Sequence, residues 1–135
     1  MSTKQTSSRY SARYHDLIEF INKGRKCNER KIANNTIVVH FPDEKLCRIY
    51  LHGNCIAVIE PDSIFLMTAG WYTVTTKDRL NAIIGDWPFR IQQYDYVWYL
   101  CEWIDNTWQI VCEFGKQISI SYDGSSFRVR ENGSM

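Results

Sequence analysis

Residues 96–114 read YVWYLCEWIDNTWQIVCEF and predict a long β-hairpin. Two runs of aromatic and β-branched residues, the types that strands prefer, flank Asp105-Asn106, which is a natural two-residue turn. Across this turn the expected facing pairs are Trp103–Trp108, Cys101–Ile110 and Tyr99–Cys112. Because these side chains are all apolar or aromatic, we predict that their face of the hairpin is the core side.

The opposite face of this hairpin mixes apolar with polar side chains. It carries Trp98 and Leu100 together with Glu102 and Gln109. Such a face is either half covered by another element or available to a partner. A shift of one residue in the pairing would exchange the two faces, because successive side chains of a strand alternate.

The same two-residue period predicts strands over most of the chain after residue 35. We expect them at Thr36–Phe41, Leu46–His52, Cys55–Glu60, Ile64–Thr68, Phe89–Gln93, Tyr96–Trp103, Thr107–Phe114, Gln117–Tyr122 and Ser126–Arg130. Gly53-Asn54 is the turn expected after the second of these segments, and Pro61-Asp62 is the turn expected after the third.

Two helices are expected beside these strands. Apolar residues recur at three- and four-residue steps at Tyr14, Leu17, Ile18 and Ile21. This stripe predicts a helix over residues 11–23 with Ser11 as its N-cap. A shorter helix is expected to begin at Thr75, with Thr75 as the N-cap and Asp78 as its capping-box partner.

These elements predict an α+β domain that is mainly antiparallel β. It has an N-terminal helix, one short internal helix and about eight strands in a bent meander sheet or a small open barrel. We assign residues 1–31 to a basic N-terminal arm with the helix, and residues 32–135 to a single β-rich domain. A chain of 135 residues is the usual size of one domain.

Composition indicates the cellular location of the protein and the state of its cysteines. The longest apolar runs are far shorter than the ~20 residues of a membrane-spanning helix, and no signal peptide is evident. We therefore expect an intracellular protein that does not enter membranes. The five cysteines are odd in number and show no C-x-x-C spacing, so buried reduced thiols are favoured over metal ligands.

The charge is unevenly distributed along the chain. Residues 1–31 hold eight Lys and Arg against three acids, a net charge of +5, and the remainder holds eight against twelve, a net charge of −4. Such asymmetry is typical of an arm that contacts a polyanion. The alternative is a solvated arm that merely neutralises an acidic body. The basic segment centres on Arg25, Lys26, Arg30 and Lys31.

Residues 70–81, GWYTVTTKDRLN, form the densest local pattern. A glycine turn presents Trp71 ahead of a capped helix whose first turn carries Lys77 and Arg79. A helix N-terminus with nearby cations suits phosphate, and an exposed indole suits a nucleobase. The structural alternative is that Trp71 fills the core and the threonines only cap the helix.

This block resembles one found in a family of small tailed-phage proteins, which have a Gly-Trp-x-Thr-x-Thr-Thr-Lys-x-Arg-Leu-Asn motif. The resemblance also covers Lys31–Thr36, Arg48–His52 and a Trp-Tyr strand at Tyr96–Leu100, and it spans roughly residues 31–116. Ala69 departs from the pattern, because a second glycine is common there. The resemblance implies a viral source and no catalytic residues.

No phosphate loop, catalytic triad motif or zinc-protease motif is present. We therefore expect no enzyme, no cofactor and no metal, but a phage accessory binding module in the host cytoplasm or the virion. Its partner would be nucleic acid or, alternatively, a host protein. The residues expected to bind are Arg25, Lys26, Arg30, Lys31, Trp71, Lys77, Arg79 and Trp98, with Trp87 as a further exposed aromatic.

Overall fold

The computed structural model describes residues 13–131 of the chain. Within this range two α-helices, ten strands and one 3-10 turn (Pro42–Glu44) follow one another with short connections. The helices are α1 (Tyr14–Asn22) and α2 (Val74–Ile83). The strands are β1 (Glu29–Ala33), β2 (Thr36–Phe41), β3 (Leu46–Leu51), β4 (Asn54–Glu60), β5 (Ser63–Met67), β6 (Phe89–Tyr94), β7 (Val97–Ile104), β8 (Thr107–Glu113), β9 (Gln117–Tyr122) and β10 (Phe127–Glu131).

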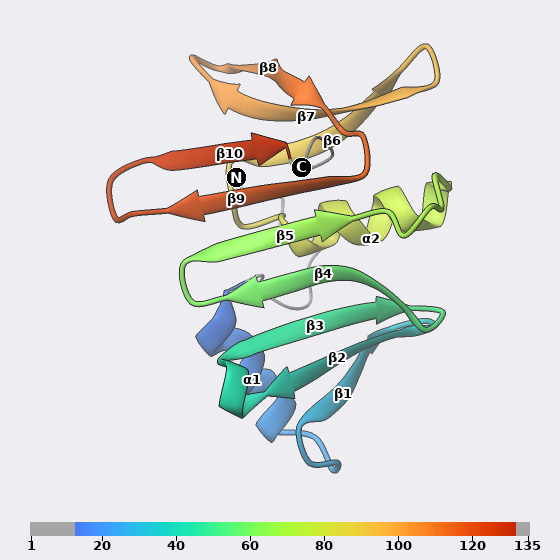
Figure 1. Cartoon of the computed structure of the whole chain (residues 1–135), viewed down its shortest axis with the longest axis vertical. Coiled ribbons are helices and arrows are strands. Elements are labelled where there is room, and N and C mark those ends of the chain that lie inside the picture. Colours follow the sequence, from blue (N-terminus) through green and yellow to red (C-terminus); the bar gives the residue numbers. More distant parts are fainter. Residues whose placement is uncertain (1–12, 132–135) are drawn as a thin grey trace.

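The strands form two antiparallel sheets. Seven strands run in the order β1-β2-β3-β4-β5-β9-β10, and three more run in the order β6-β7-β8 (Figure 1). Helix α1 packs against β1, β2 and β3, while α2 lies against β4 and β6. The predicted α+β class with mainly antiparallel strands is thus confirmed. Within the described residues the strands form two sheets with no closed barrel.

One core joins the helices to both sheets. It contains Leu17 and Ile21 of α1, Leu80 and Ile83 of α2, and strand residues such as Ile118, all of them buried. Leu17 and Ile21 belong to the stripe that predicted the first helix, and burial of each contributes about 2 kcal/mol. The predicted N-cap, Ser11, lies outside the described residues.

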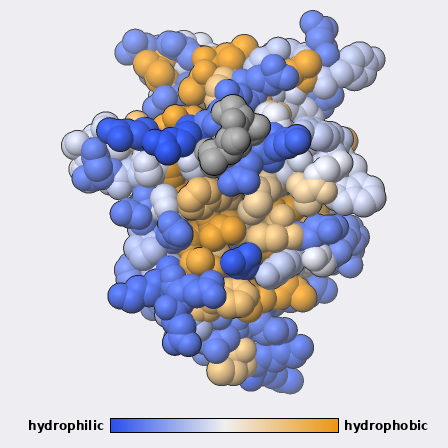
Figure 2. Space-filling view, viewed as in Figure 1, coloured by the Kyte–Doolittle hydropathy of each residue, from blue (hydrophilic) through white to orange (hydrophobic). Residues whose placement is uncertain are grey.

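The other face of the seven-stranded sheet carries no helix (Figure 1). Hydrophobic side chains gather there in a band across the middle of the sheet (Figure 2). The register places Val58 beside Phe65 and Arg48 in this middle region, all half-buried. Antiparallel sheets tolerate one solvated face, so the fold needs no further layer here.

Most strand bounds agree with the sequence pattern, and two of them, Thr36–Phe41 and Gln117–Tyr122, agree fully. Strand β1 was not predicted, because its residues are rich in charge and most of them fall in the expected basic arm. The turn between β3 and β4 consists of His52 and Gly53 and not of Gly53-Asn54, since both turn residues have positive φ angles of 51° and 82°. This pair of angles defines the two-residue hairpin turn.

The β7–β8 hairpin has the predicted turn and begins in the predicted register. Trp103 pairs with Trp108 and Cys101 with Ile110, but a β-bulge then shifts the register. Tyr99 consequently pairs with Glu113 and not with Cys112.

The predicted core face of this hairpin is wrong near the turn, although Cys101 and Phe114 of that face are buried. Trp103 and Ile110 are exposed, whereas Trp98 and Leu100 are buried. The neighbouring strand β6 explains the reversal, because its buried Ile91 pairs with Leu100. The strand that lies beside a hairpin thus decides which of its faces enters the core.

Candidate binding site

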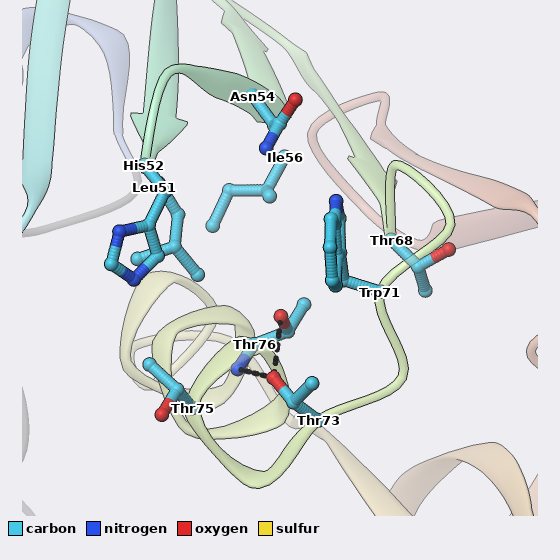
Figure 3. Close-up of a pocket in the computed structure, with 9 residues that line it drawn as sticks. All are labelled: Leu51, His52, Asn54, Ile56, Thr68, Trp71, Thr73, Thr75 and Thr76. Carbon is cyan, nitrogen blue, oxygen red and sulfur yellow. Dashed lines mark hydrogen bonds between the residues drawn. The ribbon is translucent and has the colours of Figure 1, made fainter.

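A pocket of about 350 Å³ opens at one end of the seven-stranded sheet. It lies between the β3–β4 turn, the loop after β5 and the first turn of α2 (Figure 3). The residues that line it are Leu51, His52, Asn54, Ile56, Thr68, Trp71, Thr73, Thr75 and Thr76. Segments that are distant in the sequence therefore build one hollow.

The pocket has an apolar floor and one aromatic wall. Leu51 and Ile56 are buried members of the core. The indole of Trp71 stands on one side and the imidazole of His52 on the other (Figure 3). Trp71 is 57% exposed, so its ring is available to a ligand. A buried apolar floor beside an exposed aromatic ring suits an apolar or aromatic group of a ligand.

A tight turn holds Trp71 in this position. The amide of Gly70 donates to Thr68 Oγ1 at 3.2 Å, and the amide of Trp71 donates to the Thr68 carbonyl at 2.9 Å. Ala69 and Gly70 both have positive φ angles, 55° and 86°. Glycine adopts this left-handed backbone freely, but alanine does so with strain. Thr68 itself is buried and anchors the turn to the core.

Two more apolar side chains extend the exposed surface beyond Trp71. Val74 is 78% exposed, and Tyr72 is also exposed. Tyr72 is fixed in place, because its hydroxyl donates to the Gly115 carbonyl and its ring meets Trp98 edge-on at 5.2 Å. The pocket thus continues into an exposed apolar edge, which we call the Trp71 edge and define as Trp71, Tyr72 and Val74.

Thr73, and not the predicted Thr75, is the N-cap of α2. Its Oγ1 accepts a hydrogen bond from the amide of Thr76 at 3.1 Å and contacts Thr76 Oγ1 at 3.0 Å. Thr76 stands at the third helical position, where a capping box has its second member. Asp78 therefore is not the capping-box partner that we expected. Thr75 lies within the first turn and faces the pocket rim (Figure 3).

Arg79 ties α2 to the turn between β1 and β2. Its Nε donates to Thr36 Oγ1 at 3.0 Å, and its Nη2 donates to the Asn34 carbonyl at 3.4 Å. The amide of His52 donates to the Asn35 carbonyl at 2.8 Å, so the β3–β4 turn joins the same place. Three of the four segments that carry the phage resemblance thus converge beside the pocket.

The two helix cations, Lys77 and Arg79, both contact other residues of the protein. Arg79 also meets Asp78 at 3.2 Å, and its side chain is only 19% exposed. Lys77 Nζ donates to Gln93 Oε1 at 3.2 Å. Arg79 is therefore tied to the sheet and paired with an acid, whereas Lys77 keeps its charge and contacts only the neutral amide of Gln93.

Trp98 and Trp87 are not exposed. Trp98 is 4% exposed and packs edge-on against Tyr72 and Phe114. Trp87 is also buried, with Phe127 at 5.4 Å between ring centroids. Trp98 therefore supports Tyr72 from inside, and only Trp71 among these three tryptophans can meet a partner directly.

The predicted basic residues lie around a second hollow of about 520 Å³, which is formed by the segment that leads into β1 and by the start of β1 itself. Arg30 is turned inward, donating to the Phe20 carbonyl at 2.9 Å with its guanidinium 4.2 Å from the Phe20 ring centroid. Lys26 forms an exposed ion pair with Glu29 at 3.5 Å. Within residues 13–131, no acid lies within ion-pair distance of Arg25 or Lys31, and both are exposed.

Two thiols, those of Cys47 and Cys112, are poorly reactive, whereas Cys27 is exposed. Burial raises the pKa of Cys47 to about 12 and, first among several causes, raises the pKa of Cys112 to about 11. Such thiols stay protonated near neutral pH and are poor nucleophiles. Among residues 13–131, no group of three or more His, Cys, Asp or Glu is placed to hold a metal ion.

Sequence reasoning found Trp71 but missed the rest of the pocket. Leu51, His52 and Ile56 come from a hairpin that was assigned only a structural role. The signal that would have found Leu51 and His52 is the resemblance itself, because its Arg48–His52 segment supplies the wall opposite Trp71. Tyr72 and Val74 lay inside the quoted motif and gave no separate signal.

The model of the Kyanoviridae Gp96 protein family matches residues 15–121. This match covers α1, the pocket and both sheets up to β9. No curated protein and no solved structure matches the chain. No helix within residues 13–131 has the length and apolar character that a membrane span requires.

Proposed function

The chain belongs to the Kyanoviridae Gp96 protein family, a family of phage proteins, and from this premise we propose that it is an accessory module that binds another protein. The site is the pocket beside Trp71, and the bound group is an apolar or aromatic side chain of the partner. The module acts by binding to its partner and catalyses no reaction.

The observation that carries this proposal is the Trp71 edge beside the pocket. Three large apolar side chains at positions 71, 72 and 74 are exposed next to a hollow with a buried apolar floor. Tryptophan and tyrosine are the residues that most often dominate protein interfaces. Soluble proteins rarely leave such groups clustered in solvent unless they bind something.

The charge pattern favours a protein over nucleic acid at this pocket. Among its lining residues only His52 is ionisable. Of the two neighbouring cations, Arg79 is bonded to Thr36 and paired with Asp78, which leaves Lys77 as a single charge beside the pocket. A nucleic-acid site needs cations that are free to meet phosphates, because these contacts supply most of the affinity.

The same lining residues argue against catalysis at the pocket. Threonine and asparagine surround His52, and no cysteine, serine or carboxylate is among them. Most threonine hydroxyls of the lining are bonded to Gly70 or to each other, and among the described residues no hydrogen bond pairs one of them with the His52 ring as a nucleophile is paired with its base. We assign His52 to the wall of a binding pocket.

The test is affinity capture of partners by the full chain from phage-infected host lysate after nuclease treatment. The wild-type protein is compared with Trp71→Ala and with Tyr96→Ala, a matched exposed aromatic of the β6–β7 turn that does not line the pocket. We expect a stoichiometric protein partner whose capture falls at least about 30-fold with Trp71→Ala and is unchanged with Tyr96→Ala. Equal capture by both variants would refute the role of the pocket.

A second candidate function is binding of nucleic acid by the basic segment Lys23–Lys31. Five cations line the second hollow against one acid, Glu29, and Arg25 and Lys31 have no acidic partner among the described residues. Exposed cations of this kind make contacts with phosphates that do not depend on sequence. The aromatic pocket lies elsewhere, so this contact would be electrostatic only.

The test for the second function is binding of short single- and double-stranded oligonucleotides at about 50 and 200 mM salt. We expect binding that weakens steeply with salt and that is reduced further by the double variant Arg25→Ala, Lys31→Ala. If no oligonucleotide binds at the lower salt, or if binding ignores salt, the second function is excluded. The Trp71→Ala variant serves as the control and should bind as the wild type does.

A further inference from the structure

Strand β8 forms an open edge of the three-stranded sheet. It pairs with β7 on one side only. Figure 1 shows β8 at one end of the described part of the chain, with no helix or strand beyond it. Its side chains are largely exposed, among them Ile110 at 56% and Val111. An open edge presents unpaired backbone groups to any strand that fits them.

The other sheet edges carry the charges that normally prevent such pairing. Strand β1 contains Glu29, Arg30 and Lys31, while β10 contains Arg128, Arg130 and Glu131. Strand β6, the other edge of the smaller sheet, contains Arg90. Strand β8 has no Lys or Arg, and its one acid, Glu113, stands at its end. Charged edges block edge-to-edge association, so β8 alone among the described edges is left open to it.

The hairpin turn shows which backbone groups of β8 face outward. Ile104 and Thr107 flank the two-residue turn, and in such a hairpin the flanking residues form a hydrogen-bonded pair. Because hydrogen-bonded and non-bonded pairs alternate, Thr107 and Gln109 turn their backbone groups toward β7. Trp108 and Ile110 therefore direct theirs toward the open edge.

We propose that the occupant of this edge is β8 of a second copy, paired antiparallel about a twofold axis at Gln109. In this register Trp108 faces Ile110 of the second copy, and the two residues can exchange both backbone hydrogen bonds. Gln109 faces itself, and the bulge after Ile110 lies outside the paired segment. No charged residue of the strand lies opposite another, so no like-charge repulsion opposes this pairing.

Two features favour a second copy over another partner. The pairing is self-complementary: Trp108 of one copy faces Ile110 of the other, so the backbone groups that point outward on both strands form hydrogen bonds with each other. The exposed Trp103 also continues the apolar face, since it lies edge-on to Trp108 at 5.2 Å. Pairing would join two three-stranded sheets into one six-stranded sheet, with Arg90 of each copy 5.0 Å from the centroid of its own Trp108 ring.

The first experiment measures the mass of the full chain by sedimentation over a range of concentrations. We expect a dimer that Ile110→Lys dissociates with at least about 10-fold weaker association, because two lysines would then flank the axis. Tyr96→Lys is the matched control, since Tyr96 is 93% exposed in the β6–β7 turn, and this variant should remain dimeric. A monomeric wild type at about 100 μM would overturn the proposal.

The second experiment fixes the register and does not depend on the folding of Ile110→Lys. Gln109→Cys is made in a Cys27→Ser background, because Cys27 is an exposed thiol. Residues that face each other in a non-bonded pair lie about 4.5 Å apart between Cα atoms, which a disulfide spans. We expect mild oxidation to cross-link Gln109→Cys and not Tyr96→Cys. A dimer in which Gln109→Cys does not cross-link would overturn the proposed pairing.

Discussion

Arg79 Nε donates a hydrogen bond to Thr36 Oγ1 across 43 residues of sequence, at 3.0 Å. Thr36 is fully buried at the start of β2, and its hydroxyl donates a hydrogen bond to the Asn34 carbonyl at 2.7 Å. This chain of bonds fastens α2 to the sheet beside the pocket. Arg79, which the sequence pattern predicted to bind phosphate, thus stabilises the structure around the pocket.

Arg79→Ala should therefore destabilise the protein. The change leaves the Asn34 carbonyl and the buried Thr36 hydroxyl with fewer partners, which costs about 1–3 kcal/mol. Urea unfolding of the variant and the wild type gives the difference. Lys77→Ala, whose bond to Gln93 is exposed, should change the free energy of unfolding by less than about 0.5 kcal/mol. Equal effects of the two changes would contradict the structural role of Arg79.

Thr73→Ala should lower stability by about 1 kcal/mol, because it removes the N-cap of α2. Thr75→Ala should cost less than about 0.5 kcal/mol, since Thr75 is exposed and within the first turn. Thermal unfolding of both variants separates the two positions. A larger effect at Thr75 would contradict this assignment and would support Thr75 as the N-cap, as the sequence pattern predicted.

Ala69→Gly should stabilise the protein by about 1 kcal/mol. Ala69 has a φ angle of 55°, which strains a residue with a Cβ atom and which glycine adopts freely. Binding through Trp71 should persist, because the turn keeps its hydrogen bonds to Thr68. The measurement is denaturant unfolding of the variant, and a lower stability than that of the wild type would show that the turn gains nothing from glycine.

Stability should fall as the pH drops from about 7 to 5, in part because of His40. Burial lowers the pKa of His40, and its Nε2 shares a hydrogen bond of 3.0 Å with the Tyr14 hydroxyl. The unfolded chain takes up a proton near pH 6.5 that the folded chain resists, so acid favours unfolding.

The measurement is urea unfolding of the wild type and of His40→Gln at pH 7 and pH 5. The variant removes the titrating group, so its loss of stability between these two pH values should be smaller. If the two proteins lose the same amount, His40 does not contribute to the pH dependence.

Local patterns were enough to predict most of the strands but not the faces of the longest hairpin. The Asp105-Asn106 turn fixed the pairing of Trp103 with Trp108 correctly. Which face is buried depended on Ile91 of the adjacent β6. The alternation of side chains within the β7–β8 hairpin alone does not indicate this contact. The bulge at Val111 then returned Phe114 to the core side.

The candidate site was predicted in part for a similar reason. Trp71 stood out because a large aromatic follows a glycine turn, and it is exposed beside a pocket. Arg79 and Trp98 were assigned to binding from residue type alone. Their partners, Thr36 and Phe114, are distant in the sequence, so only the fold reveals that both side chains are structural.

The central claim is that the Trp71 pocket receives a partner protein, and site-specific photo-cross-linking tests it most directly. A photoreactive residue replaces Val74, which is 78% exposed at the pocket rim, in the full chain expressed in phage-infected host cells. The same residue at Tyr96 is the control.

We predict one defined protein adduct at Val74 that disappears when Trp71→Ala is added, and no such adduct at Tyr96. An adduct at Val74 that survives Trp71→Ala, or the absence of any adduct there, would contradict the claim.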